Sequence, residues 1–342
     1  MRRALRNIVP LLALGAAVWY LVFRRVPLAE LKAAVAGARP GAMAAALGVM
    51  GLYFLCDAGN TARGLRCLGY RVGLLRCLQY AAAGFFFSAV TPSSSGGQPM
   101  QLCYMRRQRI DPGHGALVLL LELICWQAVS LLYGIVGLAV GREIFRRTAS
   151  PFRLLAAVGM GLNILVFCLS LAAVCFPGLA KGLGTALSCR LARRPNLLRV
   201  WDRVRTQLDR FAESAPLIRR NLGLLLAMFL TTAVQLGALY SVPFWVYRAL
   251  GLSGWGLPAV AAVQAVVSLS VGALPLPGAM GVGEGGFLTA FRLLFPPQLL
   301  GSAMVLSRGV SFYLCVVLTG MALLLCRLSI SRRSEERRVG KE

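Results

Sequence analysis

A succession of apolar segments runs through this chain, each of about 20 residues and nearly free of charge. A helix of that length can cross a bilayer, and inside lipid it satisfies its own backbone hydrogen bonds. The composition agrees, because 58% of the residues are hydrophobic. We therefore predict an all-α polytopic integral membrane protein with about six full spans, at residues 8–23, 41–60, 116–140, 154–176, 221–247 and 299–327.

The chain carries a formal net charge of +25. In a soluble domain such a charge would indicate nucleic-acid binding, but here the arginines collect in the links between apolar segments. This distribution is typical of positive-inside topology and of contact with anionic lipid, so we expect no direct nucleic-acid binding. The longest and most basic link, residues 177–220, is predicted to be cytoplasmic, which with six spans places both termini in the cytoplasm.

Both ends of the sequence bear on the domain boundaries. Segment 8–23 is followed by Arg24 and Arg25 and by no small-residue cleavage site, so we expect a first span and not a signal peptide. Residues 333–342 (RSEERRVGKE) resemble the in-frame translation of a common sequencing adapter, with an ordinary charged tail as the alternative. We expect one membrane domain over residues 1–332, with halves at about 1–145 and 150–332.

Two irregular segments interrupt the apolar sequence. Residues 91–99 read TPSSSGGQP, and residues 275–286 read PLPGAMGVGEGG. Proline removes a backbone donor and glycine relaxes the backbone, so we expect helix to break at both places. Arginines on both sides of the first segment indicate that it enters the membrane and returns to the same face. Because irregular backbone at membrane depth must be enclosed by protein or water, we predict two broken re-entrant hairpins and look for a binding site there.

The order of these elements indicates a possible inverted repeat. Each half contains a span, a second span, a broken hairpin and a third span, and an odd number of crossings inverts the second half. The breaks align weakly, with Pro92 four residues before Gly96 and Pro277 four residues before Gly281. In inverted-repeat transporters, corresponding broken segments indicate a substrate site near the membrane midplane.

The two breaks supply most of the candidate ligand groups, which are Thr91, Pro92, Ser93, Ser94, Ser95, Gly96, Gly97, Gln98, Pro277, Gly278, Gly281, Gly283 and Glu284. In the first break, hydroxyl and amide side chains and the backbone N–H groups near the glycines could hold a phosphate or a hydroxylated headgroup. The alternative is a kink packed against neighbouring helices, which serine and glycine also favour.

Ionisable side chains inside apolar spans are the other candidates. Their charge is costly in a membrane, so those that are present often serve a function. Glu122 and Arg308 join Glu284 and Asp57 in this group, whereas Arg63 and Arg292 lie near expected interfaces, where long side chains reach water. The alternative is that Glu122 and Arg308, or Asp57 and Arg63, neutralise one another as structural pairs.

Sequence signals for catalysis are weak. The single histidine, His114, lies in a link without a cysteine or carboxylate at metal-ligand spacing, and the ten cysteines form no CxxC pair. The sequence has no convincing nucleotide-binding loop and no nucleophile elbow. We therefore expect no catalytic residue, no metal and no cofactor.

The segment SAVTPSSSGGQPMQLCYMRR at residues 88–107, the following Glu122, and LPLPGAMGVGEGGFLTAF at residues 274–291 together carry a family resemblance. The chain resembles, over nearly all of residues 1–327, the membrane domain of the lysylphosphatidylglycerol synthase family, which includes the multiple peptide resistance factor. The resemblance implies a bacterial cell membrane protein that moves aminoacylated phosphatidylglycerol between leaflets and contributes to resistance against cationic peptides.

The same resemblance leaves three functions open. The first is translocation of phosphatidylglycerol or its lysyl derivative, with the first break on the headgroup, Arg308 or Arg292 on its phosphate, and Glu122 or Glu284 on a cationic aminoacyl group. The second is phosphatidylglycerol lysyltransferase activity, with this chain as the membrane half and a synthase domain as partner. The third is a lipid-binding scaffold without transport. A homo-oligomer is also possible.

Overall fold

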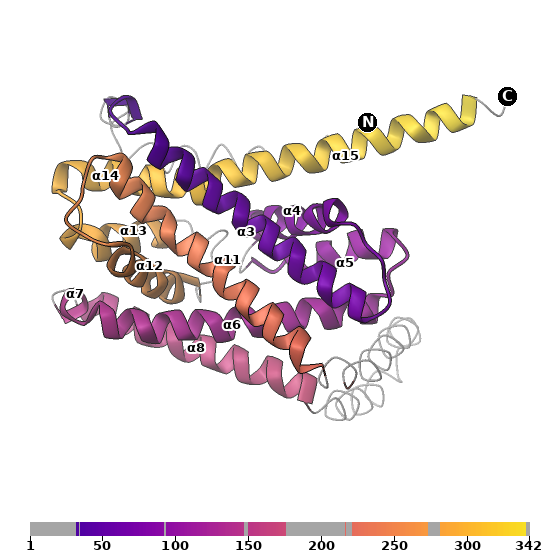
Figure 1. Ribbon diagram of the computed structural model, residues 1–342, viewed down its shortest axis with the longest axis horizontal. Helices are drawn as coiled ribbons and strands as arrows, with labels where there is room; N and C mark the ends of the chain where they lie inside the picture. Colours follow the sequence, from indigo (N-terminus) through magenta and orange to yellow (C-terminus); the bar gives the residue numbers. More distant parts are fainter. Residues whose placement is uncertain are drawn as a thin grey trace, which may run out of the picture.

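The computed structural model describes residues 32–33, 35–91, 94–146, 150–175, 216, 221–272 and 281–339. The elements within these ranges are helices (Figure 1), and they confirm the predicted all-α class. They are α3 (Pro40–Cys67), α4 (Leu74–Val90), α5 (Gly97–Arg107), α6 (Pro112–Val140), α7 (Arg142–Arg146), α8 (Ser150–Cys175), α11 (Leu222–Ala249), α12 (Leu257–Gly272), α13 (Val282–Ala290), a 3₁₀ turn (Phe291–Leu293), α14 (Pro297–Arg308), a π-helix (Gly309–Tyr313) and α15 (Leu314–Val339).

Five of these helical stretches are long and apolar enough to cross a membrane. They are Pro40–Cys67, Pro112–Val140, Phe152–Cys175, Leu222–Ala249 and the nearly continuous stretch Pro297–Cys326. They coincide with five of the predicted spans, and the chain is a multi-pass membrane protein. The predicted span 8–23 and nearly all of the basic link 177–220 lie outside the described residues.

Both predicted breaks are present. The first separates α4, which ends at Val90, from α5, which begins at Gly97, and the second separates α12, which ends at Gly272, from α13, which begins at Val282. Thr91 adopts an extended conformation with φ −109° and ψ 146°, as expected for a residue before a proline. In the two breaks, Pro92, Ser93, Pro277 and Gly278 lie outside the described residues.

The first break is tied back to its own hairpin. The Thr91 hydroxyl donates to the carbonyl oxygen of Phe87 at 2.6 Å and accepts from the backbone N–H of Gly96 at 2.9 Å. Ser94 follows with a positive φ of 54°, which turns the chain towards α5. These contacts satisfy backbone groups that a broken helix would otherwise leave unpaired.

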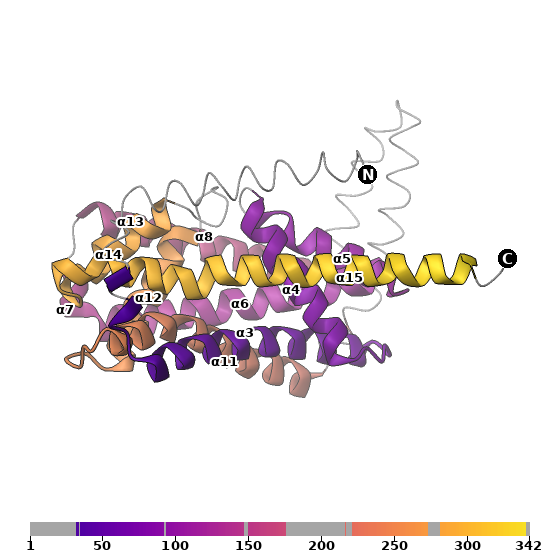
Figure 2. The same cartoon turned by 90° about the horizontal axis from the view of Figure 1, so that it is seen from above.

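The helices pack around a central pair. At the centre, α3 and α11 lie side by side (Figure 1). Hydrogen bonds from Gln235 to Asp57 and from Asn60 to Thr232 show that these two helices run antiparallel. The hairpin helix α4 packs on α3 and α15, while the hairpin helix α12 packs on α11 and α6. Helix α15 passes along the molecule beside α4 (Figure 2), and α8 packs on α6 and α12.

Close contact within and around the hairpins requires glycine. A Cβ atom on Gly97 would lie 2.8 Å from the carbonyl oxygen of Gly84 and would also overlap the hydroxyl of Ser88. On the second hairpin, a Cβ on Gly137 of α6 would lie 2.8 Å from the carbonyl oxygen of Ala262 on α12. Small residues of this kind let helix backbones approach where hydrophobic burial gives little driving force.

We expect Gly97→Ala to destabilise the protein by about 1–3 kcal/mol, because a Ser88 hydroxyl can rotate away but the Gly84 carbonyl cannot. Gly48→Ala in α3 is the matched control, since a Cβ there meets nothing within 4 Å. The control should keep or slightly raise stability, as alanine favours helix. Thermal unfolding in detergent checks both variants, and equal midpoints would contradict the packing argument.

Candidate functional site

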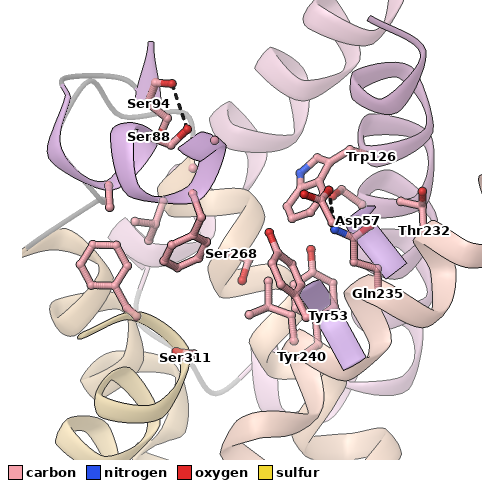
Figure 3. Close-up of a pocket in the computed structure, with 18 of the residues that line it drawn as sticks. Tyr53, Asp57, Ser88, Ser94, Trp126, Thr232, Gln235, Tyr240, Ser268 and Ser311 are labelled. Atoms are coloured by element: carbon pink, nitrogen blue, oxygen red, sulfur yellow. Dashed lines mark hydrogen bonds between the residues drawn. The ribbon is translucent and has the colours of Figure 1, made fainter. Parts of the chain in front are cut away.

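A cavity of about 710 Å³ lies inside the bundle, between the two broken hairpins. Its walls come from α3, α6 and α11 as well as from both hairpins and the segment around the π-helix. Figure 3 shows Ser88 and Ser94 on one side of the cavity and Asp57, Gln235 and Thr232 on the other. The polar lining residues of the hairpins are Ser88, Ser94, Ser95, Gln98 and Gln101 from the first and Gln264 and Ser268 from the second.

Six of the predicted site residues line this cavity: Ser94, Ser95, Gln98, Glu122, Gly283 and Arg308. The breaks therefore lie at one site although they are far apart in the sequence. Thr91, Gly96 and Gly97 build the first hairpin behind the lining, and the bond to Thr91 already occupies the Gly96 N–H group. Gly281 and Glu284 lie behind Arg308.

Arg308 is the basic residue among the described side chains that line the cavity, and α13 holds it in place. Its Nε donates to Oε1 of Glu284 at 3.1 Å, and the same oxygen accepts from the Tyr313 hydroxyl at 3.0 Å. The other carboxylate oxygen accepts from the backbone N–H of Gly281. The guanidinium also lies over the ring of Phe312, 4.9 Å from its centroid, which is a cation–π contact.

The π-helix places Arg308 and Tyr313 beside one carboxylate. Residues five positions apart lie about 140° apart around an α-helix, because each residue advances by about 100°. The wider π-turn at Gly309–Tyr313 brings the two side chains to the same side. Gly283 leaves room for the arginine, since a Cβ there would lie 3.0 Å from a terminal nitrogen of the guanidinium.

Two carboxylates, Asp57 and Glu122, lie at another part of the cavity. Oδ1 of Asp57 accepts from Nε2 of Gln235 at 3.1 Å. The buried hydroxyl of Thr61 lies 2.7 Å from Oε1 of Glu122 and 3.2 Å from the backbone oxygen of Asp57. Thus one hydroxyl connects the two acidic residues, and α3 and α6 present them to the same space.

The alternative ion pairs considered from the sequence are replaced by other contacts. Arg308 pairs with Glu284 and not with Glu122. Arg63 donates to Thr231 at 2.6 Å and to Asn60 at 3.2 Å, away from the Asp57 carboxylate. Arg292 is exposed and does not line the cavity. Helix packing decides these partners, and the sequence order does not reveal them.

Several lining residues escaped the sequence analysis because each is a single polar group in an apolar helix. Gln127, Gln264 and Ser307 line the cavity, and in the described part of the chain Oε1 of each glutamine and Oγ of the serine have no hydrogen-bond partner. Buried polar atoms are normally satisfied, so these atoms indicate a polar ligand or water in the cavity. A search for glutamines inside apolar segments would have found Gln127, Gln235 and Gln264.

Within the described ranges, no three His, Cys, Asp or Glu side chains gather in a group that could hold a metal ion. The arrangement instead offers one guanidinium, two carboxylates and many uncharged hydrogen-bonding groups in a membrane interior. Such a site can bind a polar or charged group while apolar surfaces surround it.

Comparison with known proteins gives two matches. The sequence model of a protein family described as "Lysylphosphatidylglycerol synthase TM region" matches residues 7–319. The chain is also similar to a protein from Archaeoglobus fulgidus named "UPF0104 membrane protein", with 24% identity over 251 residues, covering 72% of this chain and 74% of the relative.

The Glu284–Arg308 contact should behave as a buried pair. We expect Glu284→Gln alone to lower the free energy of unfolding by about 3 kcal/mol, because it leaves a charged guanidinium without its counter-ion. Combining it with Arg308→Gln should recover most of that loss, since neither charge then remains. Thermal unfolding of the single and double variants in detergent checks this coupling, and additive losses would contradict it.

Proposed function

This chain belongs to the family of lysylphosphatidylglycerol synthase transmembrane regions, and from that premise we propose that it translocates an anionic phospholipid between leaflets. The lipid class we propose is phosphatidylglycerol, its aminoacylated form or a close relative. Aminoacylated phosphatidylglycerol would connect the activity to cationic-peptide resistance. The observation that carries the proposal is the polar cavity enclosed by helices long enough to cross a membrane.

The size and lining of the cavity support a headgroup as its occupant. Sites for small molecules have volumes of roughly 300–1,000 Å³, and the cavity of about 710 Å³ falls inside this range. Serines and glutamines of both hairpins can hydrogen-bond the glycerol and phosphate groups of a lipid. The acyl chains would stay in the surrounding bilayer, so the headgroup is the only part of the lipid that the protein has to shield.

The charges of the cavity support the assignment of its parts. We assign the phosphate to Arg308, because a planar guanidinium with several donors suits phosphate oxygens. We assign a cationic aminoacyl group to the region of Glu122, which Asp57 shares. Glu284 serves in this proposal as the counter-ion that positions Arg308, since both of its oxygens already accept hydrogen bonds.

The packing supports a transporter built as an inverted repeat, with α4–α5 and α12–α13 as re-entrant hairpins. Under this proposal α3 corresponds to α11, α4 to α12 and α6 to α14–α15. The contacts agree, because α4 packs on α15 as α12 packs on α6, and α3 packs on α4 as α11 packs on α12. A substrate site at the repeat interface then follows the pattern of secondary transporters. We place the chain in a bacterial inner membrane with six spans and cytoplasmic termini.

The test reconstitutes the protein in vesicles that contain traces of acyl-labelled phosphatidylglycerol or lysyl-phosphatidylglycerol. A membrane-impermeant reductant that quenches the label reports how fast inner-leaflet lipid reaches the outer leaflet. Protein-dependent movement of either lipid supports translocation. Headgroup binding without movement would contradict it and favour a lipid-binding scaffold.

Arg308→Gln should slow this movement at least about tenfold, because a hydrogen bond to a charged group is worth about 1.5–3 kcal/mol. Arg308→Lys should retain part of the rate, since it keeps the charge but loses the planar donors. Arg292→Gln is the matched control, because that arginine is exposed and lies outside the cavity lining. Unfolding midpoints are measured in parallel, and equal rates for Arg308→Gln and Arg292→Gln would exclude the proposed role.

A further inference from the structure

The acidic part of the cavity has an unusual charge balance. Asp57 and Glu122 lie on adjacent helices, and the Thr61 hydroxyl contacts both residues. Charged groups are costly in a membrane interior, and two neighbouring carboxylates oppose each other's ionisation. A stable arrangement therefore requires a positive charge at this place, supplied either by the protein, by a ligand or by a proton.

Among the described residues, no positively charged side chain forms an ion pair with either of the two carboxylates. The described titratable and charged side chains around this region include Tyr53, Cys56, Arg63 and Arg66 on α3, Cys77 and Tyr80 on α4, Cys125 on α6, Tyr240 on α11 and Cys315 on α15. Arg63 donates to Asn60 and Thr231, and Arg66 is exposed. Arg308 is bound to the remaining carboxylate of the region, Glu284.

A separate observation indicates that a donor binds here. Gln127 is only 9% exposed, lines the cavity, and its Oε1 has no hydrogen-bond partner within the described ranges. It faces the same cavity as Glu122, because both belong to the side of α6 whose residues Glu122, Leu123, Trp126, Gln127 and Ser130 line that cavity. Two carboxylates and an unpaired amide oxygen form a set of acceptors, so their ligand must donate hydrogen bonds.

We propose that Asp57 and Glu122 exchange one proton for the cationic group of the lipid, which makes translocation a proton antiport. When the site is empty of lipid, one carboxyl group holds a proton. Binding of an ammonium group releases this proton to the aqueous side from which the lipid entered. After the lipid leaves on the opposite side, a proton from that side restores the neutral carboxyl group.

The exchange balances in charge for a lysyl headgroup. Lysyl-phosphatidylglycerol carries one phosphate and two ammonium groups, so its net charge equals that of the proton moving the other way. The cycle is therefore electroneutral and responds to the pH gradient but not to the membrane potential. Phosphatidylglycerol lacks the ammonium groups and should move without proton exchange. This inference rests on the proposed function and adds the driving force.

The experiment uses the same vesicles, with opposite pH gradients of one unit and the membrane potential clamped at zero. One pH unit corresponds to about a tenfold change per exchanged proton, so the final outer-to-inner ratio of labelled lysyl-phosphatidylglycerol should change about tenfold with each gradient, in opposite directions. The ratio of labelled phosphatidylglycerol is the internal control and should not respond. A pH-sensitive dye inside the vesicles should report proton movement only with the lysyl lipid.

The double variant Asp57→Asn/Glu122→Gln should abolish the effect of the gradient, because no carboxyl group then remains at this place to exchange a proton. Arg292→Gln should respond as the unmodified protein does. If a variant fails to fold, the dye measurement on the unmodified protein still decides. Lysyl-lipid movement that ignores the gradient would overturn the antiport while leaving translocation intact. Absence of movement for both lipids would overturn translocation and the antiport with it.

Discussion

Backbone groups inside a membrane must find their hydrogen bonds within the protein, and the two broken hairpins are the places where this requirement is hardest to meet. The first hairpin meets it through the Thr91 hydroxyl, which contacts both the end of α4 and the turn before α5. The spanning helices then enclose both hairpins. The polar cavity lies between these hairpins, whose helices and first turn bring serine and glutamine side chains into the interior.

The basic and the acidic parts of the cavity differ in whether the protein supplies a counter-charge. Arg308 has a carboxylate, a tyrosine hydroxyl nearby and an aromatic ring beneath it, so the protein itself supplies its counter-ion. Among the residues that the structure describes, the donors to Asp57 and Glu122 are the uncharged Gln235 and Thr61. The cavity is therefore polar at both places, but its unmet demand for positive charge lies beside α3 and α6.

Much of the architecture was predictable because length and apolar character determine membrane spans, and proline and glycine determine where helix ends. Both breaks and five spans followed from these rules, and the cost of charge in a membrane made Glu122, Glu284 and Arg308 candidates. The partners of the charges did not follow, since Glu284 meets Arg308 only when α13 packs against the last span. Isolated polar residues such as Gln127 were missed because one amide in an apolar helix has no distinguishing pattern of its own.

The π-helix between Arg308 and Tyr313 amounts to one additional residue in a helix that otherwise continues. With one residue fewer, the arginine and tyrosine would stand four positions apart and would share a face of a regular α-helix. A difference in length of one residue at this point therefore leaves both side chains facing α13 and does not rotate the rest of the span. Alignments of related chains should place a single-residue gap here, between two segments whose registers are otherwise fixed.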